Sequence, residues 1–332
     1  TWGKNEPRVL IKEWLNDPRT VAVDAKGDVY VADRGSGRVL VFSPEGAKLG
    51  EFKTHLPESV EVHPKTGEIY VLGGSNCNEI TKYRSWKRPE VVAKAENLPC
   101  FRNKKKYRGL MALDASAVPP VIWVAPSPAK YSGYRLARLE DRGKSFSEPV
   151  NILDIPGNEA PSAGKCSDPD LFGNRLFMAA PKAKPDPPRV FDVNTGKPMK
   201  FKFPESVTKN ETGFDFVTGK DGNLYVLSGW PNAWLARMDS SGKPMPYPIN
   251  GSKRPGLIPG LGNPRVRHRG AFVDHGGRAY VLRQIPRNKK RFRDANVVGL
   301  YGADGKAIND RLIDSELRHL NSVKVDPQGN VY

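Results

Sequence analysis

Residues 21–33 read Val21-Ala-Val-Asp-Ala-Lys-Gly-Asp-Val-Tyr-Val-Ala-Asp33, and residues 38–46 read Arg38-Val-Leu-Val-Phe-Ser-Pro-Glu-Gly46. Short runs of alternating or continuous apolar residues, separated by turn residues, are typical of strands. A tight turn is predicted at Lys26-Gly27, because glycine adopts the positive φ that such a turn needs. The stretch therefore predicts three short antiparallel strands, the third closed by the Pro-Glu-Gly turn.

Degraded copies of this stretch fill the rest of the chain. In each copy an aromatic residue stands among aliphatic ones at the centre of the second strand, and successive aromatics are 40 to 55 residues apart. A repeat of this length, built from short strands alone, is typical of a β-propeller in which each copy is one blade. The aromatic residues are Tyr30, Tyr70, Trp123, Phe177, Tyr225, Tyr280 and Tyr332.

Seven copies predict an all-β propeller of seven blades, with six blades and an extra terminal hairpin as the alternative. The apolar run at residues 8–14 precedes the first copy. We expect it to pair with the last blade as its outer strand, because a ring of sheets otherwise leaves an open edge. The whole chain, 1–332, is then one domain, which we expect to be truncated at its C-terminal end because the seventh copy stops within its second strand.

The residues Ala22-Val-Asp-Ala-Lys-Gly-Asp-Val-Tyr-Val-Ala-Asp-Arg34, with Arg38-Val-Leu-Val-Phe42 and the following turn, resemble the NHL repeat. Copies at 60–85, 213–243 and 319–332 resemble it in part. The resemblance implies a propeller without implying a single activity. NHL propellers bind RNA, proteins or small ligands, and related propellers include metal-dependent lyases and lactonases.

The chain carries 53 Lys and Arg against 36 Asp and Glu, a net charge of +17. It contains no apolar window long enough for a membrane span. Cys77 and Cys100 are expected on the same face of one blade, either as a disulfide or as two thiols. Together with the sequons at Asn210 and Asn250, they favour an extracytoplasmic (periplasmic or secreted) location.

The positive charge is predicted to lie on one face. Loops between second and third strands, and loops that lead into first strands, share one face of a propeller, and the basic residues concentrate in those loops. A one-sided basic face is typical of a binding site for a polyanion. The candidate binding residues are Lys104, Lys105, Lys106, Arg108, Arg267, Arg269, Lys289, Lys290, Arg291 and Arg293, with Trp230 and Trp234 as ring-stacking candidates.

His55, His268 and His319 each precede a first strand. Three imidazoles at a channel mouth could bind a zinc or copper ion, and the resemblance to NHL-type lyases suggests the same arrangement. His63 and His275 lie in the opposite turns, where turn chemistry explains them, and Asp24 and Asp274 are predicted to bind turn amides.

Two functions follow. The first is a non-enzymatic binding module with a basic face for an anionic polymer (polysaccharide or nucleic acid) or an acidic protein, with no cofactor expected. The second is a metal-dependent lyase or hydrolase that uses the three histidines with zinc, copper or calcium. An architectural module within a longer polypeptide is a third interpretation.

Overall fold

The computed structural model describes residues 15–99, 108–127, 136–155, 170–172, 175–178, 189–203, 212–230, 234–248, 267–286 and 294–315, together with Val323, Val325 and Val331. Strands dominate these ranges, with short 3₁₀ turns such as Arg34–Ser36 and Ile152–Asp154 beside them. None of the helices in these ranges has the length and apolar composition needed to cross a membrane.

The first sheet confirms the strands predicted from residues 21–46. It contains β1 (Pro18–Val23), β2 (Val29–Asp33), β3 (Arg38–Phe42) and β4 (Lys48–Lys53), paired antiparallel in chain order. Every residue of β2 is buried, which explains its continuous apolar character, because neighbouring elements cover both of its faces. Gly27 adopts φ 89° in the turn between β1 and β2, as predicted.

Five further sheets repeat this meander. The second contains β5 (Ser59–Val62), β6 (Ile69–Gly73), β7 (Glu79–Tyr83) and β8 (Val91–Ala95), and the third contains β9 (Arg108–Asp114), β10 (Val121–Ser127), β11 (Ala137–Glu140) and β12 (Val150–Asn151). The fourth contains β13 (Asp170–Phe172), β14 (Arg175–Met178), β15 (Arg189–Asp192) and β16 (Pro198–Met199). The fifth contains β17 (Thr212–Thr218), β18 (Leu224–Trp230) and β19 (Leu235–Met238), and the sixth contains β20 (Arg267–Val273), β21 (Ala279–Pro286), β22 (Asp294–Tyr301) and β23 (Ala307–Ser315).

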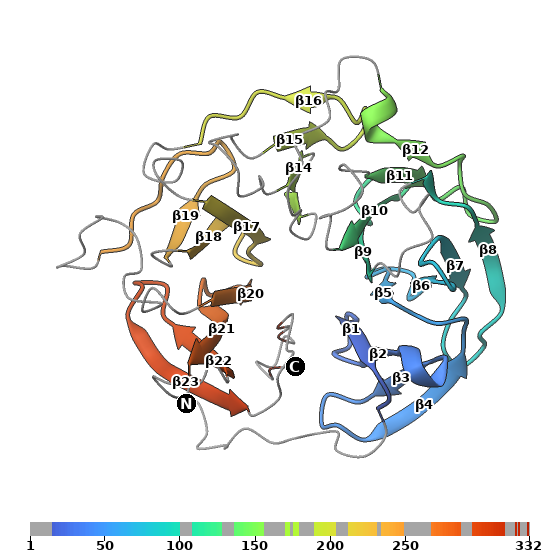
Figure 1. Cartoon of the computed structure of the whole chain (residues 1–332), viewed down its shortest axis with the longest axis horizontal. Coiled ribbons are helices and arrows are strands. Elements are labelled where there is room, and N and C mark those ends of the chain that lie inside the picture. The colour runs from blue at the N-terminus through green and yellow to red at the C-terminus, as the bar shows by residue number, and fades with distance from the viewer. Residues whose placement is uncertain are drawn as a thin grey trace.

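The sheets stand around a common axis with their first strands innermost, which confirms the β-propeller (Figure 1). The described residues form six sheets, the number given as the alternative, rather than the seven blades predicted first. Of the seventh copy they show one antiparallel bridge, Val325 to Val331, beside the sixth sheet at the C-terminal end of the chain (Figure 1). Counting second-strand motifs overestimates blades, since a blade also needs partner strands. Residues 8–14, the predicted closing strand, lie outside the described residues.

The aromatic residue of each second strand fills the boundary between one sheet and the next. Tyr30 packs with residues of the second sheet, Tyr70 with the third, and Phe177 with the fifth. All six aromatics within the described strands are at most 3% exposed. The repeated aromatic is therefore the main packing unit between blades, since large rings bury the most apolar area.

Cationic side chains on the third strands of three sheets contact a turn of the following sheet. Lys82 on β7 donates to the Gly143 carbonyl at 3.2 Å, and Arg138 Nε on β11 donates to the Val193 carbonyl at 2.9 Å. Arg237 on β19 repeats the contact with the Ala303 carbonyl at 3.3 Å. Part of the Lys and Arg content therefore holds blades together.

Candidate functional sites

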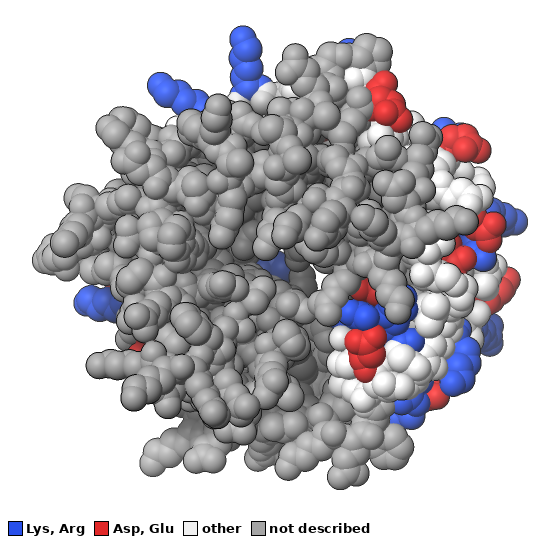
Figure 2. All heavy atoms as spheres, in the orientation of Figure 1, with Lys and Arg blue, Asp and Glu red and all other residues white. Residues whose placement is uncertain are grey.

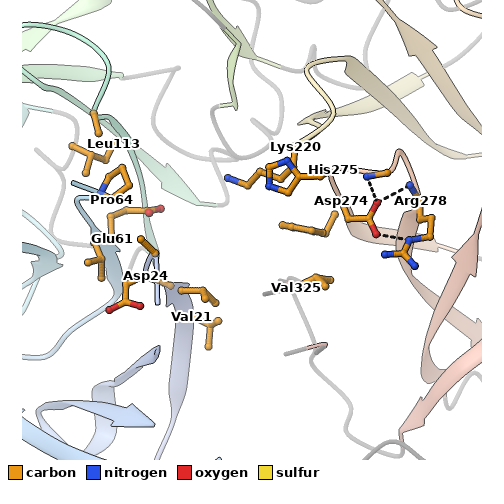
Figure 3. A pocket seen from close by; sticks show the side chains of 17 residues that line it. Val21, Asp24, Glu61, Pro64, Leu113, Lys220, Asp274, His275, Arg278 and Val325 are labelled. Atoms are coloured by element: carbon orange, nitrogen blue, oxygen red, sulfur yellow. Dashed lines mark hydrogen bonds and ion pairs between the residues drawn. The ribbon is translucent and has the colours of Figure 1, made fainter. Parts of the chain in front are cut away.

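A cavity of about 490 Å³ opens at one end of the central channel, where the turns between first and second strands meet. Its residues come from the ends of four first strands, β1, β5, β9 and β20, from the turn after β17, and from Val325. Apolar side chains, among them Val21, Leu113 and Phe272, form much of the lining (Figure 3).

The charged residues of this cavity are divided between two walls. Asp24 and Glu61 lie on the wall formed by the first two sheets, and Lys220 and His275 lie on the opposite wall, from the fifth and sixth sheets (Figure 3). Arg278 accompanies them and is engaged with Asp274, since its Nε lies 2.6 Å from the Asp274 carboxylate. The cavity therefore has a negative side and a positive side.

The two aspartates of the cavity also stabilise their own turns. Asp24 Oδ1 accepts hydrogen bonds from the amides of Lys26 and Asp28 at 2.9 and 3.0 Å. Asp274 Oδ1 accepts from the amides of Gly276 and Arg278, each at 2.9 Å. The predicted role of both residues in turns is thus confirmed, and it follows the usual preference of Asp for bonding backbone amides two to four positions ahead.

Burial and nearby carboxylates perturb the titration of groups around the Asp24 turn. Burial, followed by repulsion from Asp24, raises the pKa of the Asp28 carboxyl. Burial and the charge of Asp24 likewise raise the pKa of the Tyr30 hydroxyl, which donates to Asp24 Oδ2 at 3.3 Å. The Tyr30 hydroxyl therefore remains a protonated donor at neutral pH.

The candidate residues of the basic face lie largely outside the described residues. Lys104, Lys105, Lys106, Lys289, Lys290, Arg291 and Arg293 are in this group. Arg108 is the first residue of β9, and Arg267 and Arg269 are among the first three residues of β20. The cavity is lined by residues at the C-terminal ends of β9 and β20, so these N-terminal ends lie on the opposite face of the propeller.

On the described part of the face predicted to be basic, acidic side chains lie among the basic ones, which the prediction of a one-sided basic face did not include. Arg34 Nε lies 2.9 Å from the Glu58 carboxylate, and Arg19 Nε lies 3.6 Å from it. Glu58 is only 2% exposed, and Arg19 also contacts Asp17 at 2.7 Å. In Figure 2 basic and acidic side chains are likewise interspersed over the described first and second sheets. This sector of the face is therefore balanced in charge.

Of the three histidines proposed as metal ligands, two lie within the described residues. His55 is largely exposed, and its Nδ1 lies 2.9 Å from the Glu79 carboxylate. His268 occupies β20, and His319 lies outside the described residues. Within the ranges that the structure describes, no group of three His, Cys, Asp or Glu could hold a metal ion. His63 is buried, and its Nδ1 accepts from the amides of Lys65 and Thr66, which confirms its role in the turn.

Two other candidate residues belong to the protein core. Trp234, at 3% exposure, packs with Phe177, Phe216 and Val226 between the fourth and fifth sheets, so it is not available for stacking on a surface ligand. Trp230 ends β18.

Cys77 is completely buried, and this burial raises the pKa of its thiol to about 12. Cys100, its partner in the disulfide alternative, lies outside the described residues.

The sequence analysis did not predict that Lys220, His275 and Glu61 line one cavity. Each had an ordinary explanation as a strand or turn residue, and they are far apart in the sequence. The detectable signal was their shared place at the end of a first strand, which brings residues from different blades to the same end of the axis.

Comparison with known proteins supports the fold. The sequence pattern of the NHL repeat matches residues 15–42, which cover β1, β2 and β3. The chain is a β-propeller that carries an NHL repeat. The match lies on the stretch whose strand pattern is clearest. Among curated proteins, none matches the chain.

Several solved structures share the propeller architecture. A streptogramin B lyase is 15% identical with a TM-score of 0.61, and the match covers 97% of this chain and 91% of the lyase. Virginiamycin B lyase from Staphylococcus aureus is 14% identical with a TM-score of 0.57, covering 93% and 88%. The WD40 repeats of RRP9 are 13% identical with a TM-score of 0.59, covering 98% and 88%. At these identities the similarity establishes the fold.

Proposed function

We propose that this propeller is a non-enzymatic binding module whose face opposite the cavity binds an anionic polymer. One observation supports this proposal above others, namely how charge divides between the residues that the structure describes and the rest of the sequence. The described residues hold 30 of the 53 Lys and Arg and 27 of the 36 Asp and Glu, a difference of +3. The remaining residues hold 23 basic and nine acidic side chains, a difference of +14.

Four sequence segments account for this excess. Residues 100–107, 128–135, 249–266 and 287–293 together contain 14 Lys and Arg and no Asp or Glu. They adjoin the ends of β9, β10, β20 and β21 that lie on the face opposite the cavity. Concentrated positive charge of this kind binds phosphate, sulfate or carboxylate groups along a polymer and releases their counterions. The balanced sector around Glu58 limits the proposed surface to the third through sixth sheets.

The test measures binding of fluorescent heparin and of a single-stranded oligonucleotide at several salt concentrations. We expect the logarithm of the binding constant to fall linearly with the logarithm of salt concentration. The variant Lys289→Glu/Lys290→Glu/Arg291→Glu should weaken binding about tenfold or more and flatten this slope. A control with the same change in charge, Lys26→Glu/Lys65→Glu/Lys144→Glu, alters exposed turn residues on the cavity face.

Equal losses in the two variants would contradict a one-sided surface, and absence of binding to both polymers at low salt would contradict the proposal itself. Binding to an acidic protein such as polyglutamate, without binding to either polymer, would replace the polymer with a protein partner. An extracytoplasmic location remains a prediction, which fractionation of cells that produce the full protein would test.

A metal-dependent lyase or hydrolase is the alternative proposal. Its support is the set of three histidines predicted to precede first strands, and two of the similar solved structures are named as lyases. We would expect stoichiometric zinc, copper or calcium in the purified protein, lost in the His268→Ala and His319→Ala variants but retained in a His63→Ala variant. Metal-free protein purified without chelators would contradict it.

A further inference from the structure

We propose that the cavity on the turn face binds a small zwitterionic molecule with an apolar middle. Its anionic group would contact Lys220 and His275, and its cationic group would contact Glu61, with Asp24 adding negative charge to the same wall. This site lies at the opposite end of the channel from the proposed basic face. It therefore goes beyond the polymer-binding function and does not depend on it.

The positive wall carries two side chains whose polar groups are available. The Lys220 ammonium and the His275 ring make no hydrogen bond or ion pair with any residue in the described ranges, and both side chains are exposed. Their turns are joined, because the Lys220 amide donates to the Val273 carbonyl at 2.9 Å. Lys220 and His275 thus extend from two connected turns toward the same cavity (Figure 3).

The negative wall can accept further hydrogen bonds. Asp24 Oδ2 receives the Tyr30 hydroxyl at 3.3 Å, and a carboxylate oxygen can accept more than one donor. Glu61, half-buried on β5, adds a second carboxylate on this wall. The Glu61 carboxylate faces the positive wall across the cavity, whereas the Asp24 carboxylate is turned toward the amides of its own turn (Figure 3).

The size and lining of the cavity define the kind of ligand. A volume of about 490 Å³ is within the range of small-molecule sites, which are mostly apolar with a few polar groups. Val21, Leu113 and Phe272 provide apolar surface between the two charged walls. A ligand with a single charge would cover the charged side chains of one wall without offering them an opposite charge, and burying an unpaired charge costs free energy. The arrangement therefore favours molecules that carry both charges.

The experiment uses ω-amino acids of increasing length as probes: γ-aminobutyrate, ε-aminocaproate and ω-aminocaprylate. Caproate and hexylamine serve as probes with only one of the two charges. Affinities are measured on the whole chain by ligand-observed nuclear magnetic resonance and calorimetry. We expect at least one ω-amino acid to bind about tenfold more tightly than either singly charged probe, the size expected for one charge-assisted hydrogen bond.

Two variants assign the charges. In Lys220→Gln the zwitterion should bind no better than hexylamine, and in Glu61→Gln it should bind no better than caproate. The controls Lys144→Gln and Glu148→Gln alter exposed residues between β11 and β12, outside the cavity, and should retain the full preference. These ratios compare probes on the same variant, so a change in the folded fraction does not affect them.

Three results would overturn the proposal. The first is equal binding of zwitterionic and singly charged probes to the unmodified protein. The second is no binding of any probe up to about 10 mM, beyond which specific recognition has little meaning. The third is the same loss of preference in the control variants as in Lys220→Gln and Glu61→Gln.

Discussion

The Lys82 ammonium lies 2.8 Å from the Asp141 carboxylate, and this contact crosses from the second sheet of the ring to the third. Both side chains are 3% exposed, and the Tyr70 hydroxyl donates to the same carboxylate at 2.5 Å. Glu68 completes the cluster, 3.0 Å from the Lys82 ammonium. A buried, fully engaged cluster of this kind fixes how two blades fit together, because removing one member leaves the others without compensation.

Replacing Lys82 with methionine should lower the free energy of unfolding by about 3–5 kcal/mol, since Asp141 would remain buried without its cation. The control Lys65→Met, at an exposed turn position, should change it by less than about 0.5 kcal/mol. Urea denaturation followed by circular dichroism measures both. Similar stability of the two variants would show that the interblade ion pair contributes little.

The stability that Tyr225 contributes to the folded protein should be lost at alkaline pH. Burial and its hydrogen bond to Asp221 raise the pKa of the Tyr225 hydroxyl above the ordinary value of 10.0. The folded state therefore holds the hydroxyl proton more tightly than the unfolded state does. The contribution of Tyr225 to the free energy of unfolding is complete below pH 10 and is lost as the pH rises toward the pKa of the folded state. Above pH 10 the stability advantage of the unmodified protein over Tyr225→Phe should shrink by about 1.4 kcal/mol per pH unit.

Urea midpoints of both proteins at pH 8 to 11 test this prediction. At pH 8 the Tyr225→Phe variant should be about 1 kcal/mol less stable, the usual value of one hydrogen bond. A difference between the two proteins that stays constant from pH 8 to pH 11 would contradict the role assigned to Tyr225.

Gly67 tests the turn chemistry without any change in packing. It has φ +73°, and an added Cβ would meet no atom within 4 Å. Gly67→Ala should therefore cost about 1–2 kcal/mol from backbone conformation alone. Gly67→Asn should cost less, because Asn tolerates the left-handed region. Thermal unfolding measures the two variants, and equal effects would point to a cause other than backbone conformation.

Trp234 should act on stability and not on ligand binding. Trp234→Ala should lower the free energy of unfolding by about 3–5 kcal/mol through the cavity it leaves among Phe177, Phe216 and Val226. Trp234→Phe should cost less. The affinity of the folded protein for heparin should be the same in all three proteins, measured by anisotropy at a temperature where each is folded. A specific loss of affinity would restore Trp234 as a ligand contact.

Much of the fold could be predicted because its signals are local. The strand pattern around Tyr30, the glycine at position 27 and the spacing of the aromatic residues predicted antiparallel sheets in a ring, and the structure confirms them. The number of blades was harder, because Val331 continues the motif, and the described residues show it in a bridge to Val325 outside the six sheets. A sequence motif marks one strand, whereas a blade depends on pairing among several.

The candidate sites were less predictable because charge and aromaticity have several uses in a propeller. Trp234 has the composition of a ligand-binding residue but packs in the core, and Arg34 is bound to a buried Glu58 instead of extending a basic surface. Lys82 likewise links two sheets. Residue type alone does not distinguish these uses, because burial and partners depend on contacts between distant segments.

The sequence by itself determined the strands, their turns and their repetition, because alternation of apolar residues and the conformational freedom of glycine act within a few neighbouring positions. Only the tertiary structure decided that Asp24 and Lys220, which are far apart in the sequence, would line one cavity from opposite walls. Packing between successive sheets carries each first strand to the axis, and this packing sets which turn ends meet there.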